Sequence, residues 1–259
     1  MCDAVDVTDE PAPADAPLLP VADATPAPTP HERVLAIVEV LICSDYPTQL
    51  ALAATFAAFG FMPSRDGVLS LAYVATLSLA DTVLLVGLIV FFLRARGDDP
   101  RQALFGSSPI LKELQAGIPM MFVAFGIAVV IMLGAQAVAP WLHTVPDNPL
   151  KDLVRSPTDA VLFALVLIVA GGVREEVQRA FLLGRFERWL GGARTGLVVS
   201  SLLFGAGHVI QGADAALATT VLGAFWGLVY LKRRSIGAPI VSHAGFNLVQ
   251  VLQYLVLAR

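Results

Sequence analysis

The sequence predicts an all-α fold, a polytopic membrane bundle of about six to eight transmembrane helices. Hydrophobic residues make up 56% of the 259-residue chain and charged residues only 15%, whereas about a quarter of a soluble domain is charged. Six or seven apolar segments come close to the roughly 20 residues that a helix needs to cross the hydrocarbon core. The lipid bilayer is therefore an expected partner, while no basic stripe interleaved with aromatic residues indicates nucleic acid.

Residues 1–32 differ from the rest of the chain in composition. They contain seven acidic residues and seven prolines but no Lys or Arg. Such a segment cannot bury enough apolar surface to offset the cost of ordering, so we predict a disordered acidic tail rich in Pro and Ala. A helical membrane domain is expected over residues 33–259. Cys2 and Cys43 indicate neither a disulfide framework nor a metal cluster.

Three spans are predicted in the first part of this domain. The region Val34–Phe61 is interrupted by Ser44-Asp45-Tyr46-Pro47, and it is either one kinked helix or an interfacial helix followed by a span. The second span, Val68–Phe92, contains Asp81, and the third is Ile118–Leu142.

Four further spans form a motif-bearing core at about residues 157–257. They are Ala160–Leu190, Leu197–Ile210, Ala213–Leu231 and Ile236–Leu257, of which the second is short. An ionisable group inside a bilayer costs roughly 2.5–3.5 kcal/mol, so such groups tend to persist where they have a function. We therefore expect the catalytic core in these last four helices.

The basic residues of the short loops predict the orientation of the chain. When residues 34–61 are counted as one crossing, ten Lys and Arg residues fall on one side of the membrane and four on the other. Cytoplasmic loops carry the excess of Lys and Arg, so we expect a cytoplasmic-membrane protein with its N-terminus inside. If residues 34–61 do not cross, the N-terminus lies outside and the later spans keep their orientation.

A carboxylate pair in the fourth span is the first catalytic candidate. Glu175 and Arg179 are four residues apart, so they lie on one helix face and can pair, while Glu176 points about 100° away. One carboxylate would then be tethered and the other free to accept a proton as a general base. The competing interpretation is a charged patch at the cytoplasmic end of the helix, near Arg185 and Arg188.

Two histidines and an amide follow on later spans. His208 comes after Phe204-Gly205-Ala206-Gly207, whose glycines allow a neighbouring helix to approach closely, although a lone histidine there is more often a hydrogen-bonded core residue. His243 and Asn247 are four apart, which suits two donors for an oxyanion but also suits a polar pair that holds helices together. Polar sites on three separate spans are best explained by one shared cavity. A base, a second imidazole and oxyanion donors suit amide hydrolysis by activated water, and the signatures of serine hydrolases and zincins are absent from the sequence.

These residues resemble the CAAX-prenyl-protease and bacteriocin-processing family of intramembrane endopeptidases, also called the Abi family. Its pattern is a Glu-Glu pair followed by Arg, then Phe-x-x-x-His, then His-x-x-x-Asn or Asp, on successive helices. Here the pattern falls within about residues 171–250, on Glu175-Glu176 with Arg179, Phe204 to His208, and His243 to Asn247. The resemblance implies an endopeptidase acting on a membrane-associated or prenylated peptide. Glu175 with His208 would activate the water, and His243 with Asn247 would stabilise the oxyanion.

The chain departs from the family pattern at Arg179. The family usually has three residues between the second Glu and the Arg, whereas only Val177 and Gln178 separate Glu176 from Arg179. Arg179 therefore lies four residues after the first Glu. Either the tether has moved to Glu175 or Arg179 does not play the family's role.

The predicted depths of these residues in the bilayer also differ. Counting along the spans places Glu175 and His243 nearer the cytoplasmic ends and His208 nearer the opposite end. A shared cavity therefore requires helix tilt or a shift of the predicted boundaries by a few residues.

The resemblance leaves the cofactor open. Members of the family have also been described as metalloproteases, and Glu175, His208 and His243 would supply a zinc site with an open position for water. Asn247 suits an oxyanion donor better than a zinc ligand, so we expect metal-free glutamate catalysis. The alternatives to a protease are a non-catalytic membrane protein that binds a peptide or partner helix, in immunity or as a scaffold, and a proton- or ion-coupled transporter. The sequence contains no detectable repeated half, which argues against the transporter interpretation.

Overall fold

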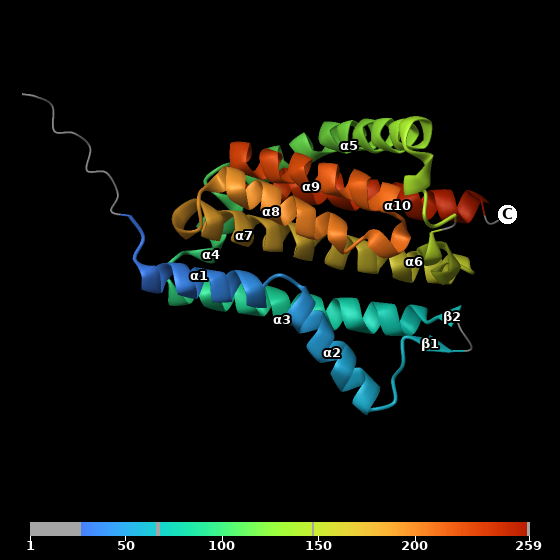
Figure 1. Cartoon of the computed structure of the whole chain (residues 1–259), viewed down its shortest axis with the longest axis horizontal. Helices are drawn as coiled ribbons and strands as arrows, with labels where there is room; N and C mark the ends of the chain where they lie inside the picture. Colours follow the sequence, from blue (N-terminus) through green and yellow to red (C-terminus); the bar gives the residue numbers. More distant parts are fainter. Residues whose placement is uncertain (1–26, 66–67, 147, 258–259) are drawn as a thin grey trace, which may run out of the picture.

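The computed structural model describes residues 27–65, 68–146 and 148–257. Within these residues, ten α-helices form a bundle, and β1 (Ser64–Arg65) and β2 (Val68–Leu69) form a short antiparallel hairpin. Figure 1 shows α5 along one side of the bundle, α1 to α3 along the other, and α6 to α10 between them. The predicted all-α helix bundle is confirmed. Residues 1–26 of the predicted tail lie outside the described residues.

The first helix, α1 (Pro30–Ile42), begins earlier than the predicted boundary at residue 33. The Thr29 hydroxyl accepts a hydrogen bond from the Glu32 N–H, and the Glu32 carboxylate accepts one from the Thr29 N–H at 2.8 Å. This capping box satisfies N–H groups that the helix itself leaves free. At Asp45 the chain adopts φ +80°, and α2 (Tyr46–Ala58) leaves at 44° to α1. The predicted interruption is therefore a break between two helices.

The chain is an integral membrane protein with several long apolar helices. By length and hydropathy, three helical stretches of the described residues can cross a membrane: α3 (Leu71–Ala95), α4 with α5 (Pro100–Phe105 and Ile110–Val138), and α9 (Ala213–Arg233). The bent α1–α2 pair would add a fourth. This number is below the expected six to eight, because three of the predicted spans do not qualify. α8 (Ala193–Ala206) has only 14 residues, the helix through the glutamate pair is heavily charged in its second half, and the apolar run of the last helix (Gly237–Leu257) is interrupted by polar residues such as His243 and Asn247.

One continuous helical path positions the glutamate pair. It consists of α6 (Pro157–Val166), the π-helical segment η3 (Leu167–Arg174) and α7 (Glu175–Trp189). Wide π-helical turns inside helices are frequent at functional sites. The last helix, α10 (Gly237–Leu257), approaches η3 so closely that a Cβ at Gly172 would lie 2.8 Å from the Ala244 side chain. This close approach brings the polar residues of α10 to the glutamate pair.

Ion pairs join the helix ends at one end of the bundle. Arg185 on α7 contacts Glu39 of α1 at 2.6 Å and Asp98 of the α3–α4 loop at 3.3 Å. Arg234, which follows α9, makes a bidentate contact of 2.5 and 2.6 Å with Glu187 of α7. These pairs stabilise the packing of α1, α7 and α9.

Candidate active site

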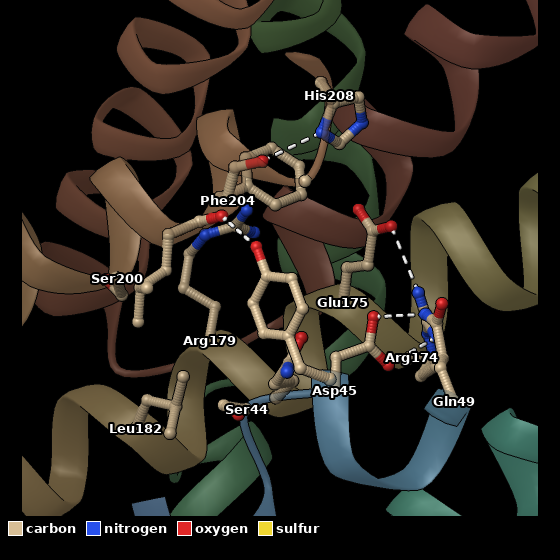
Figure 2. Close-up of a pocket in the computed structure, with 14 residues that line it drawn as sticks. Ser44, Asp45, Gln49, Arg174, Glu175, Arg179, Leu182, Ser200, Phe204 and His208 are labelled. Atoms are coloured by element: carbon tan, nitrogen blue, oxygen red, sulfur yellow. Dashed lines mark hydrogen bonds and ion pairs between the residues drawn. The ribbon is translucent and has the colours of Figure 1, made fainter. Parts of the chain in front are cut away.

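Four of the six predicted side chains line one cavity. This cavity of about 220 Å³ is lined by Glu175, His208, His243 and Asn247, with further residues of α6, η3, α9 and α10. A second cavity, of about 270 Å³, lies towards the break between α1 and α2, and its lining again includes Glu175 and His208. Figure 2 shows these two side chains in the second cavity, with His208 drawn above Glu175. Glu175 therefore lies where the two cavities meet.

The difference in depth expected from residue counting is absent in the structure. At 1.5 Å per residue, α8 is about 21 Å long, shorter than the hydrocarbon core, so the half-buried His208 just after its end does not reach the far side of the core. The helical path from Pro157 to Trp189 places Glu175 near its middle. A short helix and a long one thus bring the two residues to the same cavity.

Glu176, and not Glu175, is the carboxylate that Arg179 tethers. Glu176 is 1% exposed, and its Oε1 accepts hydrogen bonds from Arg179 Nη1 and from His243 Nδ1. The expected pairing of Glu175 with Arg179 is wrong, because residues three and four apart on a helix are both within reach. Of these two carboxylates, the more buried one, Glu176, pairs with Arg179. The Arg179 guanidinium also lies 4.7 Å from the centre of the Phe204 ring.

His243 is held in one orientation. Its Nδ1 donates to Glu176 at 2.8 Å, and its ring stacks on Trp226 at 3.8 Å between centroids and 16° between planes. Its Nε2 consequently lies 3.7 Å from Glu175 Oε2. This separation exceeds a hydrogen bond, and a water molecule beside both atoms can bond to each.

His208 also has one nitrogen engaged and one free. Its Nδ1 donates to the Phe204 carbonyl oxygen at 2.8 Å, the interaction drawn in Figure 2. A neutral imidazole that donates from Nδ1 accepts at Nε2. His208 can therefore accept a hydrogen bond from a water molecule in the cavity beside Glu175.

Asn247 lies one helical turn after His243 on α10. Its amide nitrogen packs on Gly171 of η3, where a Cβ would lie only 2.5 Å from it, so a larger residue at position 171 would displace the amide. Among the described residues, no hydrogen-bond partner engages the Asn247 side chain. Its amide N–H groups are thus available to an oxygen atom in the cavity.

A cluster of charged residues beside Glu175 was not predicted as part of the site. Arg174 is buried, and it contacts Asp45 at 2.7 Å, Asp81, and Glu175 at 3.3 Å. Figure 2 shows Arg174 joined by dashed lines to both Asp45 and Glu175. The available signal was the location of Asp81 inside an apolar span, because a carboxylate there needs a partner.

The side chains as they lie do not fit the alternative zinc site. Within the described ranges, no three His, Cys, Asp or Glu side chains are grouped closely enough to hold a metal ion. The contacts of His243 Nδ1 with Glu176 and of His208 Nδ1 with a backbone carbonyl leave Nε2 of each ring free, as in metal-ligating histidines. The spacing of the three side chains is therefore what disagrees with a zinc site. The set of Glu175, His208 and His243 therefore does not form the three-ligand arrangement of a catalytic zinc centre.

Comparison with known proteins connects this geometry to a family. Residues 157–249 match the family model described as type II CAAX prenyl endopeptidase Rce1-like. This segment resembles the Rce1-like family. The Rce1-like segment contains all six predicted residues, so the expected resemblance is confirmed, and the family implies a protease of the CAAX type with a protein or peptide substrate. No curated protein and no solved structure matches the chain.

Proposed function

We propose that the chain is an intramembrane endopeptidase that hydrolyses a peptide bond of a membrane-associated, CAAX-type substrate with a glutamate-activated water. The position of Glu175 carries the proposal. One of its carboxylate oxygens lies 3.3 Å from Arg174, and the other lies 3.7 Å from His243 Nε2. Glu175 thus combines a fixed orientation with an oxygen that faces the cavity.

In this reaction, Glu175 is the general base. Its carboxylate takes a proton from a water molecule that also donates to His208 Nε2, and the water oxygen attacks the carbonyl carbon. The carbonyl π electrons move to oxygen and form a tetrahedral oxyanion. When the C–N bond breaks, protonated Glu175 returns its proton to the leaving amine. A general acid–base residue of this kind typically contributes about 10²–10⁴-fold to a rate.

His243 and Asn247 are the donors for the oxyanion. Glu176 engages Nδ1 of His243 and directs Nε2 into the cavity. Nε2 donates to the oxyanion in the doubly protonated form of the ring, whose charge the Glu176 carboxylate balances. The Asn247 amide lines the same cavity from one turn further along α10. Donors that are already in place stabilise the transition state without reorganisation.

The two cavities that meet at Glu175 suit an extended peptide. Their volumes of about 270 and 220 Å³ accommodate a few side chains on either side of the scissile bond and exclude a folded domain. A short segment entering from the membrane is therefore the proposed substrate, and the orientation with the N-terminus in the cytoplasm is part of the proposal.

Replacement of the site histidines tests the proposed function. In a lipid-reconstituted assay with a library of CAAX-type and transmembrane peptides, His208→Ala and His243→Ala are expected to abolish cleavage, because one orients the water and the other stabilises the oxyanion. His143→Ala is the matched control, since His143 pairs with Asp214 at 2.7 Å and lines neither cavity. Unchanged cleavage in either site variant contradicts the mechanism. Peptide binding without cleavage by the wild type supports the non-catalytic alternative.

Chelation tests the metal-free mechanism. Treatment of the purified protein with a strong chelator is expected to leave the cleavage rate unchanged, because Glu175 activates the water without a Lewis acid. The rate is measured before and after treatment and after addition of zinc. Loss of cleavage that zinc restores would assign the reaction to a metalloprotease.

A further inference from the structure

We infer that Arg174 is a positioning residue for Glu175, held in place by Asp45 and Asp81; this inference rests on the proposed function. Arg174 ends η3 and is 5% exposed. Asp45 comes from the break between α1 and α2, and Asp81 comes from α3. Both lie outside the Rce1-like match. The N-terminal part of the chain thereby reaches the catalytic carboxylate.

The two terminal nitrogens of Arg174 have different partners. Nη1 donates to Asp45 Oδ1 at 2.7 Å and to Asp81 Oδ2, whereas Nη2 donates to Glu175 Oε1 at 3.3 Å. The planar guanidinium fork allows this division, and the compact ammonium of a lysine does not. One side of the fork is therefore anchored, and the other faces Glu175.

The contacts with the two aspartates explain how the adjacent residues Arg174 and Glu175 come to face each other. Consecutive side chains on a helix point about 100° apart, so Arg174 does not meet Glu175 by helix geometry alone. Asp45 and Asp81 accept hydrogen bonds from the guanidinium and hold it where Nη2 reaches Glu175. With Oε1 of Glu175 engaged, Oε2 faces the cavity and His243.

Misplacement of Oε2 of Glu175 lowers the rate of the reaction more than it weakens substrate binding. A displacement of about 1 Å of a reacting group can cost about 10²-fold in rate. A residue that only holds helices together would act through the stability of the fold instead. Arg174 and a structural arginine should therefore differ in their effect on kcat.

Arg185 is the matched structural arginine. It is 1% exposed, and it joins α7 to Glu39 of α1 and to Asp98, as Arg174 joins η3 to other elements. It lies ten residues after Glu175, about 15 Å along the helix. Its replacement by lysine removes a buried fork far from the reacting atoms.

The first test compares Arg174→Lys with Arg185→Lys in the full-length protein in lipid, using the peptide that the wild type cleaves. Arg174→Lys is expected to lower kcat about 100-fold with KM nearly unchanged, whereas Arg185→Lys retains the wild-type kcat. Wild-type kcat in Arg174→Lys, or an equal loss in both variants, overturns the inference.

A second test does not depend on cleavage. The Tm shifts of Arg174→Lys and Glu175→Gln are expected not to add in the double variant, because contacting residues are coupled, while those of Arg185→Lys and Glu175→Gln add. Additive shifts for Arg174 and Glu175 overturn the positioning role. Failure of the wild type to cleave any peptide overturns the proposed function instead and leaves this coupling to decide the role of Arg174.

Discussion

Glu175→Gln is expected to lower kcat by about 10²–10⁴-fold and to leave the protein folded. The amide keeps the shape of the side chain but removes the charge of its contact with Arg174. It cannot take a proton from water, and a general base contributes about 10²–10⁴-fold to a rate. Since Glu175 has no bond to Arg179 and lines both cavities, the loss should appear in kcat and not in peptide affinity. Single-turnover cleavage of a bound peptide measures this difference.

Glu187→Gln is the matched control for this prediction. Glu187 lies on the same helix, α7, and forms its ion pair with Arg234 outside the two cavities at Glu175. Its replacement should leave kcat at the wild-type value. Substantial cleavage by Glu175→Gln together with a loss in Glu176→Gln would reassign the base to the second glutamate.

Glu176→Ala is expected to destabilise the fold by about 3–5 kcal/mol, because removal of one member of a buried ion pair leaves its partner charge uncompensated. Glu176 is 1% exposed, and both Arg179 and His243 bond to its Oε1. Thermal or denaturant unfolding in detergent measures the change. Any loss of cleavage should then follow from lost order at His243 as well as from instability.

Glu187→Ala is the control that separates the effect of burial from the effect of charge on the stability of the fold. Its pair with Arg234 has two short contacts, but the two side chains are 35% and 55% exposed, and exposed pairs contribute about 0–1 kcal/mol. A loss of stability no larger in Glu176→Ala than in Glu187→Ala would contradict the structural role assigned to Glu176.

Much of the fold and the membership of the site follow from residue type and spacing. Apolar runs predict helices because a bilayer contains no water to bond with the backbone. The ionisable residues inside those runs predict a shared site because isolated charges in lipid are costly. The convergence of Glu175, His208, His243 and Asn247 could therefore be predicted from the sequence.

The pairings within the site could not be predicted in the same way. Helix geometry places both Glu175 and Glu176 within reach of Arg179, so spacing favoured Glu175, although the structure pairs Glu176. The lengths of α8 and of the path through η3 also depend on packing, and these lengths remove the expected difference in depth between His208 and Glu175.

Composition and residue spacing are enough to establish an all-α membrane protein whose last helices carry converging glutamate, histidine and asparagine residues. Both are local properties of the chain, and the cost of isolated charges in lipid turns them into a prediction of a shared site. Three further features depend on the packed bundle: the tether on Glu176, the orientation of Glu175 towards the cavity, and the link from Arg174 to Asp45 and Asp81. They depend on which side chains are buried against which helices, and residues 45 and 174, far apart in the chain, meet only when the helices are packed together.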